Sequence, residues 1–166
     1  MSSDRDLVHD HIVVGVDGSE PSKHALRWAL FLALATGSTV EAVTAWEPLT
    51  AYGWMGAGFA YMPTDWDPAG DAEKALIATV DEVFDEHRPP GLQITVLEGN
   101  AATVLLERSA GARMLVMGSR GHGGFAGLLL GSVSAVCTAH AVCPVLVLHG
   151  TTPPPTGTAS PAGPTS

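Results

Sequence analysis

The residues best suited to chemistry in this chain lie in one glycine-rich stretch that runs from Met117 to Ser134. The stretch follows a short apolar run, Met114 to Met117, and leads into residues 132–139, which have the composition of the first turns of a helix. Glycines let a backbone approach a ligand closely, and the N–H groups of such a loop and of a helix N-terminus point at an anion. The stretch therefore predicts a nucleotide-binding loop, in which Ser132 either caps the helix or donates its hydroxyl to a phosphate oxygen.

Two familiar phosphate-binding motifs are excluded by the residues around this stretch. A Walker-type loop requires Gly-Lys-Ser/Thr, whereas the two lysines, Lys23 and Lys74, stand in predicted helices. The pattern Gly121-x-Gly123-x-x-Ala126 resembles a dinucleotide fingerprint, but a fingerprint follows the first strand and precedes an acidic residue by about 20 positions. No acidic residue follows Gly121 anywhere in the chain.

The elements that must hold this loop in place alternate between strands and helices. Strands are predicted at residues 11–16, 39–45, 92–97, 114–117 and 144–148, and helices at about 20–36, 71–88, 101–110 and 132–139. This alternation is typical of α/β proteins, in which helices cover both faces of a parallel sheet and the crossovers are right-handed. Ligands of such folds bind at the carboxyl ends of the strands. If the first and fourth strands are neighbours, the turn at residues 17–19 and the glycine loop form the two sides of one crevice.

Apolar periodicity also predicts which helix faces are buried. In the first helix the shared face holds Ala25, Trp28, Ala29, Leu32 and Ala33, while Leu26, Leu30 and Phe31 predict a contact on a second side. In the second helix the expected buried face consists of Leu76, Val80, Val83, Phe84 and His87.

The size and charge of the chain narrow the functional classes. Its 166 residues suffice for one domain, which we place at residues 11–150, after a tail at 1–10 and before a tail at 151–166 whose Pro, Thr, Ser, Gly and Ala composition predicts disorder. Two cysteines, no apolar run of membrane-spanning length and a polar start without a signal-peptide core lead us to expect a cytoplasmic protein. The net charge of -9 argues against nucleic acid or an anionic membrane as a partner.

The charge is distributed unevenly along the chain. All 17 acidic residues lie within residues 1–107, whereas residues 108–166 carry Arg108, Arg113 and Arg120 and no acid. A segment free of carboxylates suits a site for a polyanion. The alternative is that short apolar strands and a neutral tail leave little room for charge.

A long segment between the second strand and the second helix, residues 46–70, has the least regular pattern. It contains six of the ten aromatic residues, namely Trp46, Tyr52, Trp54, Phe59, Tyr61 and Trp66. Structureless loops of this length are uncommon in compact domains and are often functional or mobile. The segment either lies over a ligand or a partner subunit, or is an insertion that packs on its own side chains.

Several stretches together resemble the universal stress protein family. The spacing Gly118-x2-Gly121-x9-Gly131-Ser132 is similar to the ATP-binding signature of that family. Residues 12–19 (IVVGVDGS), 116–123 (VMGSRGHG), 131–134 (GSVS) and 143–147 (CPVLV) agree with it in order, so that the resemblance extends from residue 11 to about residue 149. It implies a Rossmann-like, adenine nucleotide α-hydrolase-like fold: an open five-stranded parallel sheet in the order 3-2-1-4-5, with ATP at the ends of strands one and four.

The resemblance also implies which residues hold the nucleotide. Those beside the adenosine are Gly15, Val16 and Asp17, with the backbone of Ala45 near the adenine. Those that flank the ribose and phosphates are Met117, Gly118, Arg120 and Gly121, and those that hold the phosphate chain are Gly131, Ser132, Val133 and Ser134. Phosphate contacts through backbone N–H and hydroxyl groups agree with a loop that lacks lysine. Arg113 stands where the family often has an acid before the fourth strand, at a position expected on the surface.

Several side chains that could bind a ligand or a metal also have a purely structural explanation. Asp17 either only caps its turn or also contacts the ligand, where it can help to hold a divalent ion, Mg²⁺ or Mn²⁺, on the phosphates. His122 either touches a phosphate or is a solvated loop residue. Cys137, His140 and Cys143 have a spacing that suggests zinc, but a fourth ligand is lacking, and the favoured interpretation is that both cysteines are small buried hydrophobic residues.

Three functional hypotheses follow. Hydrolysis needs a base, a cation and a charge stabiliser near the γ-phosphate, and the sequence offers Arg120 and Asp17 without a dedicated base, so the first hypothesis is an ATP-binding regulator in the stress response with slow or no turnover. The second is a weak ATPase or phosphotransferase of the same fold. The third is a nucleotide-independent interaction module. The apolar strand Pro144 to Leu148 is expected at a sheet edge, and in the family that strand pairs across a two-fold axis, which implies a homodimer that acts on a client protein the sequence does not name.

Overall fold

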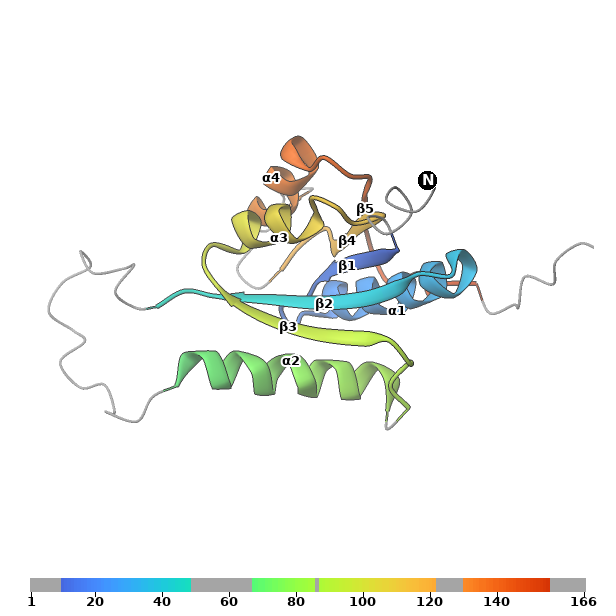
Figure 1. Ribbon diagram of the computed structural model, residues 1–166, viewed down its shortest axis with the longest axis horizontal. Helices are drawn as coiled ribbons and strands as arrows, with labels where there is room; N and C mark the ends of the chain where they lie inside the picture. The colour runs from blue at the N-terminus through green and yellow to red at the C-terminus, as the bar shows by residue number, and fades with distance from the viewer. Residues whose placement is uncertain (1–9, 49–66, 86, 122–129, 156–166) are drawn as a thin grey trace, which may run out of the picture.

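The computed structural model describes residues 10–48, 67–85, 87–121 and 130–155 of the chain (Figure 1). Five parallel strands form one sheet in the order β3-β2-β1-β4-β5. The strands are β1 (His11–Gly15), β2 (Thr39–Trp46), β3 (Leu92–Glu98), β4 (Met114–Gly118) and β5 (Val145–Leu148). The predicted parallel α/β fold and strand order are confirmed, and β1 lies directly beside β4 as the crevice hypothesis requires.

Two helices cover each face of the sheet. The helices are α1 (Glu20–Thr36), α2 (Pro68–Phe84), α3 (Ala101–Ser109) and α4 (Ser132–His140). In Figure 1 α2 lies below the sheet, and α3 and α4 lie above it. The buried residues of α1 share one hydrophobic cluster with those of α2, which places α1 on the α2 face. Each helix connects two parallel strands. This explains why the sequence alternates so regularly between the hydrophobic pattern of a strand and that of a helix.

Local sequence signals account for most helix ends. Ser19 caps α1, where its hydroxyl accepts a hydrogen bond from the Ser22 backbone N–H at 3.4 Å. At the other end Gly37 adopts a left-handed conformation with φ of 69°, in which glycine carries no steric penalty. Asn100 caps α3 by accepting hydrogen bonds from the N–H groups of Ala102 and Thr103.

The second helix differs from its prediction at both ends. It begins at Pro68 instead of residue 71, because the Asp67 side chain accepts a hydrogen bond of 3.0 Å from the Gly70 N–H and caps the helix there. It ends at Phe84, because Asp85 has φ of 49° and leaves the helical conformation. The prediction that His87 belongs to the buried face was therefore wrong: His87 lies beyond the helix and is exposed.

The sheet separates two hydrophobic clusters. On the α1 and α2 side the buried set includes Ile12, Val14, Ala25, Leu26, Ala29, Ala42, Leu76 and Val80. On the α3 and α4 side it includes Val13, Val43, Val104, Leu105, Leu115, Met117 and Cys137. Consecutive residues of β1 alternate between the two clusters, as the side chains of a strand buried on both faces must.

The segments predicted to be irregular are described only in part. Trp46 belongs to β2 and residues 68–70 belong to α2, while residues 49–66, with the other five aromatic residues of that segment, lie outside the described residues. The predicted tails are described at Asp10 and at residues 151–155, and the rest of each lies outside as well. Among the helices that the structure describes, none has the length and apolar character that a membrane crossing requires.

Candidate functional site

A cavity of about 320 Å³ opens at the carboxyl ends of β1, β2 and β4. Its volume falls within the range of small-molecule sites in proteins, and its position is the usual one for ligands of open α/β sheets. All twelve residues predicted to hold the nucleotide lie on its wall, although they come from three strands, two turns and a helix. The structure therefore brings the predicted residues together at one place.

Five further residues line the cavity that sequence reasoning did not find. They are Ser22, Val43, Thr44, Ala101 and Leu105. Val43 could have been predicted from the sequence, because side chains alternate along a strand and Val43 therefore lies on the same face of β2 as Ala45. By contrast, Ala101 and Leu105 belong to α3, and only the packing of that helix on the sheet brings them over the strand ends.

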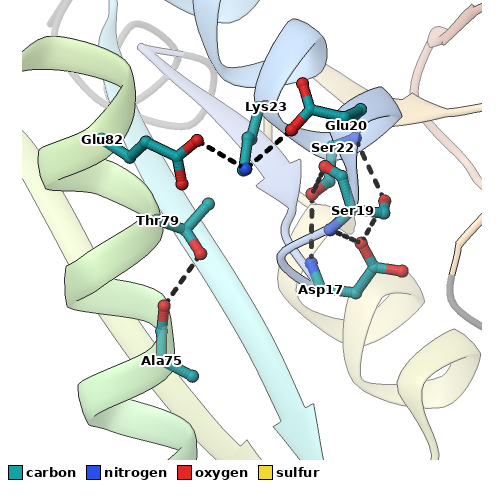
Figure 2. A network of polar contacts seen from close by, with 8 residues as sticks. All are labelled: Asp17, Ser19, Glu20, Ser22, Lys23, Ala75, Thr79 and Glu82. Atoms are coloured by element: carbon teal, nitrogen blue, oxygen red, sulfur yellow. Dashed lines mark hydrogen bonds and ion pairs between the residues drawn. The ribbon is translucent and has the colours of Figure 1, made fainter.

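The first side of the cavity is the turn after β1, drawn in Figure 2. Asp17 Oδ1 accepts hydrogen bonds from the backbone N–H of Ser19 at 3.0 Å and from its hydroxyl at 2.5 Å. The Ser22 hydroxyl in turn donates to the Ser19 carbonyl oxygen at 2.8 Å. Gly18 has φ of 81°, a conformation that favours glycine. Asp17 thus stabilises the start of α1, as the turn-capping interpretation predicted.

The same carboxylate reaches across to the second side of the cavity. A Cβ atom placed on Gly121 would stand only 2.2 Å from Asp17 Oδ2. The turn after β1 and the loop after β4 are therefore in direct contact, and the contact depends on the absence of a side chain at position 121. Because Oδ1 is occupied by Ser19, Oδ2 is the oxygen of Asp17 that lies on the glycine loop.

The start of the glycine loop packs tightly against α1. A Cβ atom on Gly118 would lie 2.5 Å from the Cβ and 2.8 Å from the backbone carbonyl carbon of Pro21. The Ser134 hydroxyl donates a hydrogen bond of 2.8 Å to the Gly118 carbonyl oxygen and is buried. That hydroxyl therefore ties α4 to β4, and the part of Ser134 left to face a ligand is its backbone.

The N-terminus of α4 forms a polar part of the cavity wall. Gly131 is the N-cap residue, with no side-chain cap, and its own N–H donates to the Ser119 carbonyl oxygen at 2.7 Å. The first hydrogen bond within the helix runs from the Ala135 N–H to the Gly131 carbonyl oxygen. The N–H groups of residues 132–134 lie before this bond and therefore have no acceptor within the helix. Ser132 is the first helical residue, and the alternative that it caps the helix was wrong.

Part of the cavity wall is apolar. Val16, Val43, Leu105 and Met117 are buried and line it. The carbonyl oxygen of Val16 accepts a hydrogen bond of 2.6 Å from the Thr44 hydroxyl, which links the ends of β1 and β2. The cavity is thus lined both by aliphatic side chains and by backbone N–H groups of a helix N-terminus, a combination that suits a molecule with a flat apolar part and an anionic part.

The charged groups on the described wall are Asp17 and Arg120, both exposed. Neither lysine lines the cavity. Lys23 Nζ lies 2.8 Å from Glu20 and 2.7 Å from Glu82 and joins α1 to α2, as Figure 2 shows. The hydrogen bonds to Glu20 and then Glu82 raise the pKa of the Lys23 ammonium above its usual value. The positive character of the site therefore comes from Arg120 and the α4 N-terminus.

The three residues considered for zinc, Cys137, His140 and Cys143, do not line the cavity. Cys137 is fully buried, with its Sγ atom 3.9 Å from the Ala102 carbonyl oxygen, as expected for a small hydrophobic residue. Burial, and to a lesser extent the nearby Cys143, raises the pKa of its thiol to about 11. Cys143 is half-buried and His140 is exposed. Over the described part of the chain, no three His, Cys, Asp or Glu residues come together as a metal site would need. His122 lies outside the described residues.

Comparison with known proteins agrees with this architecture. In fold, the chain is similar to the universal stress protein UspA from Lactobacillus plantarum, with a TM-score of 0.64, 19% identity, and coverage of 85% of this chain and 98% of that one. It is similar to a universal stress protein in complex with cAMP, with a TM-score of 0.54 at 24% identity over 85% of this chain and 97% of that one. A third structure, the universal stress protein from Archaeoglobus fulgidus in complex with dAMP, has a TM-score of 0.54 at 18% identity over 85% and 98%.

Sequence comparison extends the similarity beyond the fold. Universal stress protein Rv2623 of Mycobacterium tuberculosis (strain ATCC 25618 / H37Rv) is 33% identical over 151 residues, which cover 87% of this chain and 48% of that protein. This chain therefore spans about half the length of that relative. The model of the universal stress protein family matches residues 9–149. The chain belongs to the universal stress protein family.

Proposed function

We propose that this chain binds an adenine nucleotide, with ATP as the principal ligand, in the cavity at the ends of β1, β2 and β4. One observation carries the proposal: buried aliphatic side chains and the N-terminus of α4, which has no side-chain cap, line the same cavity. The base and ribose occupy the apolar part of the cavity beside Gly15, Val16, Asp17 and Ala45. The phosphates lie at residues 118–121 and 131–134, within reach of the α4 dipole.

The electrostatics of the cavity support an anionic ligand. Helix N-terminal N–H groups and one arginine, Arg120, face the phosphate end, while residues 108–166 contain no carboxylate to repel it. Asp17 Oδ2 is the one described carboxylate oxygen at this end. In the proposed complex it helps to hold Mg²⁺ or Mn²⁺, whose remaining ligands come from phosphate and water. The relatives named above in complex with cAMP and dAMP support an adenine ligand.

We expect turnover of bound ATP to be slow or absent. Hydrolysis requires a group that positions the attacking water, and among the described lining residues the sole carboxylate is Asp17, with Oδ1 occupied by Ser19. The chain then acts as a regulator whose bound nucleotide reports on the state of the cell. We further propose that it works in the cytoplasm as a homodimer paired through β5, and that a client protein reads its nucleotide state.

The test is the nucleotide content of the purified protein, released with acid and separated by anion exchange, followed by calorimetric titration with ATP, ADP and GTP. The informative variant is Gly131→Arg, because a Cβ on Gly131 meets its nearest neighbour, Arg120 Cα, at an ordinary 3.5 Å and the fold tolerates it. The larger side chain then fills the phosphate end of the cavity. Leu34→Arg adds the same charge at a residue that is 76% exposed on α1, away from the cavity wall, and serves as the control.

We expect ATP to bind to the wild-type chain and to Leu34→Arg, and not to Gly131→Arg. Bound ADP with phosphate release that Gly131→Arg abolishes would favour the weak ATPase instead. A chain that is purified empty and does not bind millimolar ATP would refute the proposal and leave the interaction module as the better hypothesis.

A further inference from the structure

The chain does not leave the domain where the sheet ends. After β5, Gly150 adopts a left-handed conformation with φ of 71° and turns the backbone. Two residues later the carbonyl oxygen of Thr152 accepts a hydrogen bond of 2.9 Å from the indole Nε1 of Trp28 in α1. In Figure 1 the red end of the chain emerges beside α1. The start of the predicted tail is thus held on a helix that lies 124 positions earlier in the sequence.

The residues held there favour one backbone conformation. Thr152 is followed by Pro153, Pro154 and Pro155. A residue before proline is restricted to extended conformations, and each proline has φ near about -65°. The four residues together favour a polyproline II helix, which loses little conformational entropy when it binds. Pro154 is half-buried while Pro153 and Pro155 are exposed, so one proline of the three turns toward the domain.

The surface beneath this segment has the complementary chemistry. Prolines lack an N–H group, so the segment offers only carbonyl acceptors, and the Trp28 indole is a donor that accepts no hydrogen bond. Phe31 lies one helical turn along α1, with its ring centroid 5.9 Å from that of Trp28 and the two planes at 81°. Both rings are half-buried. Aromatic grooves with such a donor are the surfaces on which proline-rich segments dock.

We propose that Trp28 and Phe31 form a docking site for a polyproline II segment, and that residues 151–155 of the same chain occupy it. The contact uses none of the residues on the cavity wall. A short tether of two residues from Gly150 to Thr152 gives the segment a high effective concentration, so a free proline-rich peptide competes poorly with it. Replacing the prolines weakens the internal contact and opens the site to a peptide.

The experiment uses the full chain labelled with ¹⁵N and the variant in which Pro153, Pro154 and Pro155 are replaced by glycine. The indole N–H signal of Trp28 is identified by its loss in Trp28→Phe, which keeps an aromatic ring and removes the donor. In the triple-glycine variant this proton is expected to exchange with solvent about five-fold faster, as the loss of one net hydrogen bond implies. The indole signal of Trp46, in β2, is the internal control for the fold.

A synthetic peptide with the sequence of residues 151–158, TTPPPTGT, is then added to each protein. It is expected to shift the Trp28 signal of the triple-glycine variant saturably, to leave the wild-type chain unchanged at the same concentration, and to lose its effect when its prolines are replaced by alanine. Equal exchange rates in the two proteins would overturn the proposal. So would a triple-glycine variant that fails to bind the peptide at millimolar concentration, since the contact would then be a product of the tether alone.

Discussion

The two faces of the sheet are covered by helices of different length. On one face α1 and α2 have 17 residues each, whereas α3 and α4 on the other have 9 residues each. At 1.5 Å per residue the long helices extend about 25 Å and the short ones about 13 Å. The long pair covers its face, while the short pair leaves the carboxyl ends of β1, β2 and β4 open. The cavity is found at that opening, next to Leu105 of α3 and Val133 of α4.

The faces also differ in what they bury. The cluster under α1 and α2 consists of aliphatic side chains, and the buried polar residues of these two helices, Ser22 and Thr79, carry only uncharged hydroxyl groups. Under α3 and α4 the sheet also buries the carboxylate of Glu41, which is 2% exposed and is paired with Arg108 of α3 and with the Thr95 hydroxyl. One face therefore supplies stability with little chemistry, and the other combines a smaller core with polar groups and a site. Five predictions test this contrast.

The largest expected effect on stability comes from removing a core side chain on the face of the sheet that α1 and α2 cover. Leu26 of α1 is fully buried, so Leu26→Ala leaves a cavity and is expected to lower the free energy of unfolding by about 3 kcal/mol. Leu105→Ala removes the same atoms beside an existing cavity and is expected to cost about 2 kcal/mol, because some of its packing partners are already missing. Chemical denaturation of both variants measures the difference. Equal losses would show that the two faces are packed alike.

The second prediction concerns the buried carboxylate. Arg108→Ala leaves the buried Glu41 without its cationic partner and with the Thr95 hydroxyl as its remaining described side-chain partner, and is expected to destabilise the fold by about 2 kcal/mol, less than for a wholly buried pair because the Arg108 side chain is 43% exposed. The double variant Glu41→Gln with Arg108→Ala removes the charge as well and should recover part of the loss, since Thr95 can still donate to the amide oxygen. No recovery in urea unfolding would mean that the pair acts through packing and not through charge.

The third prediction compares two glycines of one loop. Gly118→Ala forces a Cβ atom to within 2.8 Å of the Pro21 backbone, so it is expected to lower stability by about 2 kcal/mol. Gly121→Ala meets only the Asp17 carboxylate, a flexible side chain, and is expected to change stability by less than about 1 kcal/mol while it displaces Oδ2. Thermal unfolding separates the two, and ATP titration in the presence of Mg²⁺ should weaken for Gly121→Ala. Unchanged titration would remove Asp17 from the proposed ion site.

The fourth prediction concerns how stability depends on pH through a thiol on the face covered by α3 and α4. The pKa of the Cys137 thiol is raised by burial to about 11 from 9.0, so its contribution to stability is complete below about pH 9 and is lost as the pH rises through 11. Cys137→Ala should remove that part of the alkaline loss in unfolding experiments. At neutral pH, iodoacetamide should modify half-buried Cys143 much faster than Cys137. Rapid modification of Cys137 would mean that this face opens readily.

The smallest expected effect belongs to the ion pairs between the long helices. Lys23→Met breaks the contacts of Lys23 with Glu20 and Glu82 at the surface between α1 and α2. The Lys23 side chain is only 11% exposed, but both carboxylates lie in solvent and methionine keeps most of the apolar stem, so the fall in Tm should be slight at low ionic strength and vanish at high salt. A large fall that persists in salt would show that the stem of the lysine is part of the packing on this face.

Sequence reasoning reached the elements because they follow from local signals, whereas the residues of the site wall were implied by the resemblance to the universal stress protein family. The β-branched runs, the caps at Ser19 and Gly37, and the glycine spacing from Gly118 to Gly131 each act over a few residues. It missed the ends of α2, where Asp67 caps the helix earlier than predicted and Asp85 leaves the helix before the prolines. It placed Ser134 on the wall of the cavity, where the structure has it, but it did not find that the serine hydroxyl donates to the Gly118 carbonyl, a partner that only the packed α4 provides.

By itself the sequence determined an alternating α/β chain, a parallel sheet and a glycine loop followed by a helix N-terminus, because hydrophobic period, capping and glycine placement act over short distances along the backbone. The tertiary structure alone decided that Asp17 meets Gly121, that Leu105 and Ala101 line the cavity, and that Trp28 holds Thr152. These contacts join residues far apart in the chain. Their formation depends on strand order and helix length, which set how much of each sheet face is covered.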